Sequence, residues 1–224
     1  MDTHQERVRS QLRAAVRADE KTQQQLLETL ANDPKGTLEA LIAVLKDYFT
    51  EKPLLPLAVK AISKMGFPSN AAAIPALVEL VSDQNVPGRR EAIATLKAMD
   101  VAVVVPFFLE VLLKRDDQDT GWSYAVDSIV GGLVSREWVV ACGPALTYLL
   151  SQHDYQPGNE PDTDYLLSAL EEIIPACSYA LPAILDVALR GNQHNSRLAR
   201  RLLFSFDKET LQPYERLIAL LPAE

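Results

Sequence analysis

The sequence predicts an all-α fold. Leu and Ala recur at three- and four-residue intervals through nearly all of the 224 residues, as expected for helices with one buried side. Strand-forming residues never alternate with polar residues for long, and glycine is scarce. Two interleaved helical patterns repeat along the chain at intervals of 31 to 41 residues. We therefore predict a single domain, an α-solenoid of about five helical hairpins with a helical cap at each end.

The chain is expected to begin with two helices that cap the stack, at about residues 3–17 and 21–32. Each shows one apolar face, formed by Val8, Leu12 and Val16 and by Leu26, Leu27 and Leu30. The turn-forming sequence at residues 32–36 then breaks the helical pattern. Residues 1–33 are assigned to this N-terminal cap.

The first helix of most predicted hairpins carries a proline near its start. The four prolines, spaced 31, 38 and 38 residues apart, are Pro75, Pro106, Pro144 and Pro182. A helix start tolerates proline because an N–H there lacks an intrahelical partner. Core residues are expected two and five positions later, at Leu77 and Leu80, Phe108 and Val111, Leu146 and Leu149, and Ile184 and Val187. An earlier copy without proline contains Leu41 and Val44.

A second helical pattern lies between these segments. Its five copies start at Ala58, Ala92, Ala125, Leu166 and Leu198. Because a lone hairpin cannot bury its apolar face, two patterns with one shared period indicate hairpins stacked on their neighbours. We place the five hairpins in residues 37–206. A final helix over about 208–221 should bring Leu217 and Leu220 onto the array, so residues 207–224 are assigned to the C-terminal cap.

The segment from Ile74 to Met99 resembles a HEAT repeat. That family's unit has a proline in its first helix, an Asp at the turn, an Arg six residues later and an Ala- and Leu-rich second helix. The matching residues are Pro75, Asp83, Arg89 and Ala92 to Met99. Gly88 stands where the family prefers Val, and Asp47 takes the turn position in the preceding unit. The resemblance covers about residues 37–221 and implies a HEAT/armadillo-like array whose second helices line a concave binding surface.

On that geometry, the exposed positions of the second helices form the wall of a groove. The predicted wall positions include Leu57, Lys60, Ser63 and Leu203, and we expect the wall to be acidic and aromatic in the middle and basic at both ends. The candidate partner-binding residues are Tyr124, Asp127, Tyr165, Glu171, Glu172, Arg197, Arg200 and Arg201. Exposed tyrosines beside carboxylates form a credible recognition patch, because aromatic residues dominate interface hot spots. The alternative is a set of polar helix faces with half-packed tyrosine rings.

The sequence contains no recognisable catalytic or cofactor site. His4, His153 and His194 are far apart and lack ligand-spaced partners, so we expect no metal. A glycine-rich phosphate loop and known nucleophile motifs are also missing from the sequence. We therefore predict no catalytic residues and no cofactor. Cys142 and Cys177 lie in helical patterns and are expected to be core thiols.

Charge and hydropathy restrict the class of partner. A net charge of −8 argues against a protein that coats nucleic acid. The longest apolar runs are too short to span a membrane, and the N-terminus lacks an apolar signal segment. We therefore expect a soluble, cytoplasmic protein whose partner is another protein with a basic surface.

Three functional hypotheses remain at this point. The leading hypothesis is a non-catalytic, protein-binding scaffold or adaptor that uses its concave surface. HEAT-like arrays include bilin lyases and alkylpurine DNA glycosylases, so the resemblance also admits an enzyme of either kind. The acidity of the chain admits an immunity or inhibitor protein as the third hypothesis, because acidic inhibitors often meet basic active sites.

Overall fold

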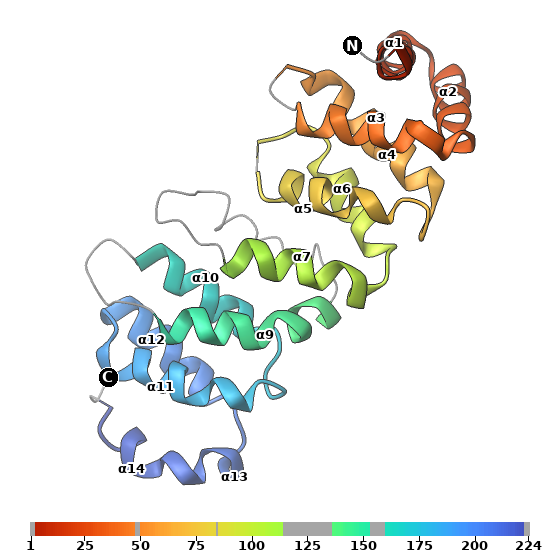
Figure 1. Cartoon of the computed structure of the whole chain (residues 1–224). Coiled ribbons are helices and arrows are strands. Elements are labelled where there is room, and N and C mark those ends of the chain that lie inside the picture. Colours follow the sequence, from red (N-terminus) through yellow and green to blue (C-terminus); the bar gives the residue numbers. More distant parts are fainter. Residues whose placement is uncertain (1–2, 48–49, 84, 114–135, 153–159, 222–224) are drawn as a thin grey trace. The chain divides into compact units, whose positions relative to one another are not determined.

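The computed structural model describes residues 3–47, 50–83, 85–113, 136–152 and 160–221. Throughout these residues, the regular elements are α-helices and short 3-10 helices, with no β-strand (Figure 1). The predicted all-α class is therefore confirmed. Internal contacts divide the chain into two compact units, Met1–Phe107 and Phe108–Glu224. The single domain and the count of five hairpins remain predictions.

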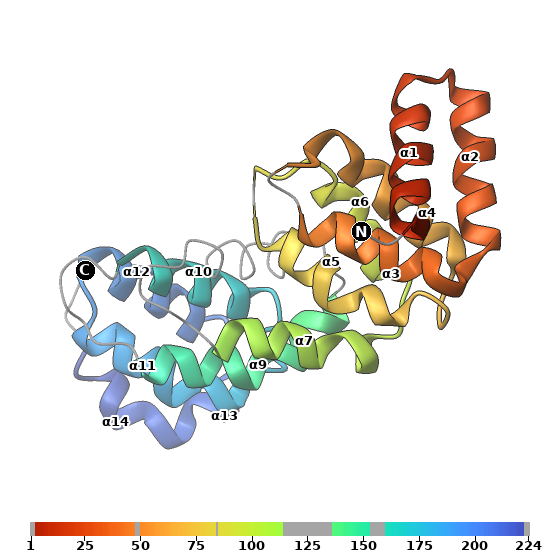
Figure 2. The same ribbon diagram turned by 45° about the horizontal axis from the view of Figure 1, so that its top comes forward.

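The described part of the first unit contains helical pairs that pack one on the next. The pairs are α1 (Thr3–Arg17) with α2 (Glu20–Asn32), α3 (Pro34–Lys46) with α4 (Leu55–Met65), and α5 (Ile74–Val81) with α6 (Arg89–Lys97). Helix α3 packs between α1 and α5, and α4 packs between α2 and α6 (Figure 2). The first helices of the pairs thus form one layer and the second helices another. The helical pair predicted at the N-terminus is confirmed, with its second helix starting one residue early.

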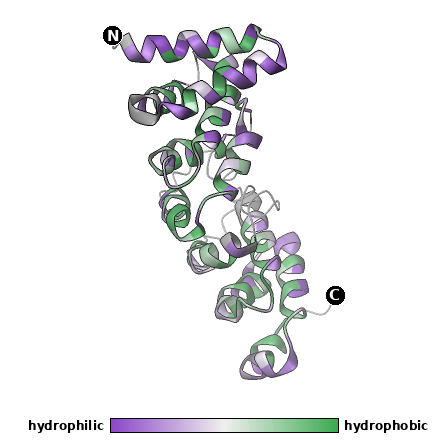
Figure 3. Ribbon diagram, turned by 90° about the vertical axis from the view of Figure 1, so that its right-hand side faces the viewer, coloured by the Kyte–Doolittle hydropathy of each residue, from purple (hydrophilic) through white to green (hydrophobic). Residues whose placement is uncertain are grey.

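The apolar stripes predicted from the sequence form the core of this unit. Leu41, Val44, Leu77, Leu80 and Leu96 are all at most 3% exposed. Helices α1 and α2 at the N-terminus carry more hydrophilic sequence than α3, α4 and α5, which follow (Figure 3). This asymmetry suits an end pair, which has a neighbouring pair on one side only.

Polar side chains close the tight turns between consecutive helices. In four turns, a side chain donates a hydrogen bond to a backbone carbonyl eight residues earlier, near the end of the previous helix. The bonds run from Gln23 to Ala15 (3.0 Å), Asn70 to Ile62 (3.0 Å), Arg89 to Val81 (3.0 Å) and Ser196 to Ala188 (2.6 Å). The last carbonyls of a helix have no intrahelical partner. These bonds therefore satisfy groups that a tight turn would otherwise leave unbonded.

Two residues of the HEAT-like signature have local roles in the turn after α5. Arg89 bonds the carbonyl of Val81, and the Asp83 carboxylate accepts a hydrogen bond from the backbone N–H of Asn85 at 3.0 Å. In the preceding pair, Asp47 instead lies 3.5 Å from the guanidinium of Arg9 on α1. The turn aspartate of that pair thus connects it to the pair before it.

The second unit contains two further helical pairs among its described residues. They are α9 (Arg136–Ser151) with α10 (Glu160–Glu171), and α11 (Leu181–Arg190) with α12 (Gln193–Leu203). Helix α9 packs on α11, and α10 packs on α12. Their core includes Leu146, Leu166, Leu170, Ile184 and Leu202, each at most 1% exposed.

Two of the four prolines lie in a different place from the one predicted. Pro75 and Pro182 occupy helix starts, but Pro106 and Pro144 lie inside α7 (Val101–Leu113) and α9. These helices start five and eight residues upstream of their prolines. Both interior prolines are exposed, so water can reach the carbonyls that their missing N–H groups leave unbonded.

The final helix predicted at residues 208–221 is broken into short pieces. They are α13 (Lys208–Leu211), the 3-10 turn η4 (Gln212–Tyr214) and α14 (Glu215–Ile218). Pro213 lies in the 3-10 turn, where its ring and missing N–H disfavour a continuous α-helix. Leu217 is 45% exposed and Leu220 is 66% exposed. The prediction that the array covers these leucines is therefore wrong.

We predict that Leu96→Ala destabilises the protein by about 2 to 5 kcal/mol, because it opens a cavity at a core position that is only 1% exposed. Urea unfolding followed by circular dichroism measures this change. Leu217→Ala is the matched control, since the same atoms are removed from a side chain that is 45% exposed. Equal losses in the two variants would contradict the assignment of the core.

We also predict that Gly88→Ala destabilises the protein more than Gly36→Ala does. Both glycines have positive φ, +93° and +78°, which costs an alanine about 1 to 2 kcal/mol. A Cβ on Gly88 would additionally lie 3.1 to 3.2 Å from backbone atoms of Leu55 and Pro56, whereas Gly36 faces only the side chain of His4 at 3.4 Å. Thermal melts compare the variants, and a smaller loss at Gly88 would refute the close approach of α6 to α4.

Candidate partner-binding surface

The predicted partner-binding residues in the described part of the chain lie on α10, just after it, and on α12. They are Tyr165, Glu171, Glu172, Arg197, Arg200 and Arg201. All are exposed except Tyr165 and Arg200, which are partly exposed. Because α10 packs against α12, residues that are 30 or more positions apart in the sequence share one surface. Tyr124 and Asp127 lie outside the described residues.

Two positions assigned to the groove wall are buried instead. Leu57 on α4 is 6% exposed, and Leu203 on α12 is 1% exposed. Helix α4 contacts α2, α3 and α6, which leaves it a narrower exposed stripe than the repeat pattern suggested. Lys60 and Ser63 on the same helix are exposed, as predicted.

Two ion pairs connect α12 to α10. Arg201 Nη2 lies 2.8 Å from Glu171 Oε2, and His194 Nε2 lies 3.1 Å from Asp164 Oδ2. The second contact is an ion pair only when the imidazole is protonated. All four side chains are at least 36% exposed, so solvent screening limits each pair to about 1 kcal/mol or less. The acidic and basic zones that the sequence separated are therefore in contact.

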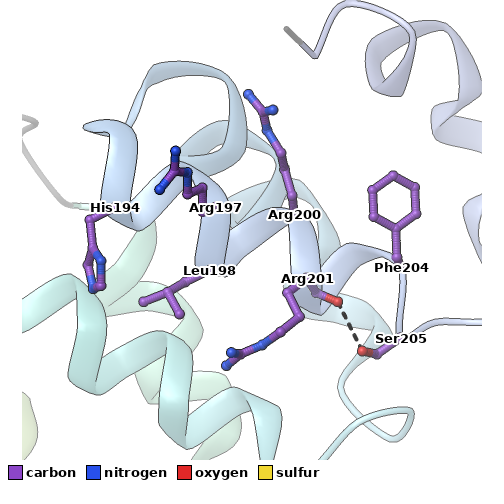
Figure 4. Close-up of a pocket in the computed structure, with 7 residues that line it drawn as sticks. All are labelled: His194, Arg197, Leu198, Arg200, Arg201, Phe204 and Ser205. Carbon is purple, nitrogen blue, oxygen red and sulfur yellow. Dashed lines mark hydrogen bonds between the residues drawn. The ribbon is translucent and has the colours of Figure 1, made fainter. Parts of the chain in front are cut away.

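A shallow hollow of about 610 Å³ lies over the exposed side of α12. Its lining consists of His194, Arg197, Leu198, Arg200, Arg201, Phe204 and Ser205 (Figure 4). In the figure, Arg197 and Arg200 extend to one side of the helix, while His194 and Arg201 extend to the other. Phe204, which is 67% exposed, stands near the C-terminal end of the helix.

The chemistry of this hollow is that of an anion-binding surface. Three guanidinium groups lie on one exposed helix, and a guanidinium can hold a carboxylate or phosphate through two parallel hydrogen bonds. The sequence prediction included the three arginines but missed Leu198 and Phe204. It treated His194 only as a possible metal ligand. The exposure of Phe204 could have been predicted from the sequence, because this residue falls outside the apolar stripe of α12.

A second hollow, of about 350 Å³, lies between α2 and α4 in the first unit. Its charged lining residues are Glu20, Lys60 and Lys64, and the Lys64 ammonium lies 3.5 Å from the carboxylate of Glu28. The basic N-terminal end predicted for the groove wall is thus mixed with acidic side chains here. Because its charges are of both signs, the hollow between α2 and α4 indicates a particular class of ligand less clearly than the hollow over α12 does.

Both cysteines are buried, which confirms the prediction of core thiols. Burial raises the pKa of the Cys142 thiol to about 12, so this group stays neutral and is a poor nucleophile at ordinary pH. Burial also raises the pKa of Cys177, whose thiol donates a hydrogen bond to the carbonyl of Leu170 at 3.6 Å. Neither thiol is placed to act on a ligand.

No three His, Cys, Asp or Glu side chains among the described residues gather in a way that could hold a metal ion. No helix within the described ranges has both the length and the apolar character needed to cross a membrane.

Comparison with known proteins adds no family assignment. No protein-family model matches the chain, and a search of curated proteins finds no similar sequence. The resemblance to HEAT repeats therefore rests on the residues quoted above.

We predict that iodoacetamide leaves Cys142 unmodified in the folded protein at pH values up to about 9. The thiol is fully buried and neutral below a pKa of about 12, whereas an ordinary cysteine has a pKa of about 8.5. Peptide mass spectrometry after brief labelling measures the modification, with the protein in guanidinium chloride as the reactive control. Rapid labelling of Cys142 in the native protein would show that the core around α9 is open.

Proposed function

We propose that this chain is a non-catalytic scaffold or adaptor of the HEAT-repeat type that binds another protein. In the proposed array, five hairpins follow the α1/α2 cap, and the short pieces α13, η4 and α14 follow the last hairpin. Four of the hairpins are α3/α4, α5/α6, α9/α10 and α11/α12. The remaining predicted hairpin includes residues 114–135, which lie outside the described part of the chain. The packing of first helices on first helices and second on second within each unit supports this arrangement.

The observation that carries the proposal is the surface shared by α10 and α12. Tyr165, Glu171, Arg197 and Arg201 come from two successive helical pairs, and the Arg201–Glu171 ion pair joins those pairs at 2.8 Å. A surface that combines an aromatic ring with charges of both signs is typical of protein interfaces rather than of apolar ligand pockets. Its residues meet only when the pairs stack.

We expect the partner to present a basic surface toward the acidic part of this face. Glu172 is exposed and follows Glu171, which pairs with Arg201. Tyr124 and Asp127, which were predicted for the same acidic part, lie outside the described residues. A net charge of −8 would also steer a basic protein toward the chain. The Tyr165 ring would provide the desolvated contact that slows dissociation.

The proposal predicts that Tyr165→Ala weakens binding of a partner purified from native lysate by about tenfold or more, mainly through faster dissociation. Tyr165→Phe should keep most of the affinity, because the ring remains. Tyr148→Ala on α9 is the matched control, since this tyrosine is 55% exposed on a first helix. Biolayer interferometry measures the rates, and thermal melts check folding.

Two outcomes would contradict the proposed function. One is that repeated captures from native lysate recover no protein that binds the purified chain. The other is that Tyr165→Ala binds like the parent while Tyr148→Ala loses affinity, which would place the interface on the first helices.

A further inference from the structure

We propose that the exposed face of α12 is a docking site for a short acidic peptide segment of the partner protein. This inference rests on the proposed function, because it names the chemistry of one contact that the partner makes. The site is formed by the side chains of Arg197, Arg200 and Arg201, with His194 at one end and Phe204 at the other.

The lining residues form a stripe of two adjacent rows along the exposed face of α12. His194, Leu198, Arg201 and Ser205 follow one another at intervals of three or four residues in one row, and Arg197, Arg200 and Phe204 do so in the other (Figure 4). The other side of α12 is anchored in the core by buried residues, which include Ser196, Ala199 and Leu202. At about 1.5 Å per residue, the stripe is about 16 Å long, the length of about five extended peptide residues.

The positive charge of this stripe is concentrated along the sequence as well. No Asp or Glu occurs from residue 187 to residue 206, although the chain as a whole has a net charge of −8. Helix α1 also carries four arginines, and three of them form ion pairs within the first unit. The pairs are Arg7 with Asp33, Arg9 with Asp47, and Arg13 with Glu51. The arginines of α12 differ in that all three line one hollow, although Arg201 also pairs with Glu171.

The ion pairs to α10 prepare the site for a ligand. Glu171 holds Arg201, and Asp164 holds His194, so these two side chains are already positioned at the edge of the hollow. The guanidinium of Arg197 forms no ion pair in the part of the chain that the structure describes, and it is exposed. A carboxylate of a bound peptide could therefore pair with Arg197 without first displacing an internal carboxylate.

Phe204 adds an apolar contact to this basic stripe. Its side chain is 67% exposed, and Leu198 is partly exposed between the arginines. An exposed aromatic ring beside guanidinium groups is a typical combination for an interface hot spot. The fitting ligand is thus a segment with several carboxylates and one apolar residue at the end that meets Phe204.

Charge also favours a peptide over nucleic acid. Carboxylates of Asp164 and Glu171 flank the stripe, and they would repel phosphates that extend beyond it. Nucleic-acid affinity depends on an extended basic surface that neutralises many phosphates. A short peptide can place its few carboxylates on the stripe and leave the flanking acidic groups in solvent.

The test measures binding of a fluorescein-labelled, C-terminally amidated peptide, Glu-Glu-Glu-Glu-Phe, to the full chain by fluorescence anisotropy at low salt. We expect the double variant Arg197→Glu/Arg200→Glu to raise the Kd by about tenfold or more. The control is Arg90→Glu/Arg216→Glu, which makes the same change in charge on exposed residues of α6 and α14. The Kd of this control should stay within about twofold of the parent's Kd. A peptide with Gln in place of Glu should also bind about tenfold more weakly.

Phe204→Ala separates the apolar contact from the charge. It should raise the Kd for the acidic peptide severalfold while leaving the dependence of binding on salt concentration unchanged, because no charge is removed. Circular dichroism melts confirm that each variant folds.

The inference is overturned if the acidic peptide does not bind, or if the Arg197→Glu/Arg200→Glu variant binds it as well as the parent does. It is also overturned if a single-stranded oligothymidine displaces the peptide and the Gln peptide binds equally well, since the surface would then select nucleic acid. A partner that binds this variant and the parent equally, but loses affinity with Tyr165→Ala, would refute the acidic docking site alone. A partner that binds all of these variants with the same affinity as the parent would refute the proposed function as well.

Discussion

Each helical pair in this chain depends on its neighbours to bury its apolar faces. Leu41 on α3, Leu77 on α5 and Ile184 on α11 are all completely buried, and each belongs to a first helix that packs on another first helix. The same holds for Ile62 on α4, which lies in the layer of second helices. Since α3 and α4 are each covered by helices on several sides, only narrow stripes of their side chains reach solvent. The charge and shape of these stripes are what a partner can recognise.

Stacking also requires short turns, and short turns leave helix carbonyls without partners. These carbonyls are satisfied by a side chain that lies eight residues later, in the turn or in the next helix. The donor is an amide at Asn70, a guanidinium at Arg89 and a hydroxyl at Ser196. The position is fixed while the chemistry varies, because any donor of suitable length satisfies a carbonyl. Gly88 also allows close stacking. Its φ of +93° and its lack of a Cβ let α6 start against the backbone of α4.

The sequence predicted the core and the helix class well because burial itself produces the periodicity. The sequence could not place Pro106 and Pro144 inside helices, since solvent access to the carbonyl one helical turn before each proline depends on packing. Leu203 was misassigned for a related reason: the repeat pattern gives the spacing of apolar residues but not how many neighbours cover a helix. The contact between Glu171 and Arg201 joins residues 30 positions apart, so it follows from stacking and not from any local motif.

An acidic chain with a basic stripe on α12 and a tyrosine on α10 is proposed to bind a partner across its second helices. Hydroxyl-radical footprinting of the complex tests this claim most directly, because oxidation reports the solvent exposure of individual aromatic rings. Phe204 is 67% exposed on the α12 side, and Tyr148 is 55% exposed on α9. Partner binding should protect Phe204 and Tyr165 from oxidation and leave Tyr148 unchanged. Protection of Tyr148 with continued oxidation of Phe204 and Tyr165 would contradict the account.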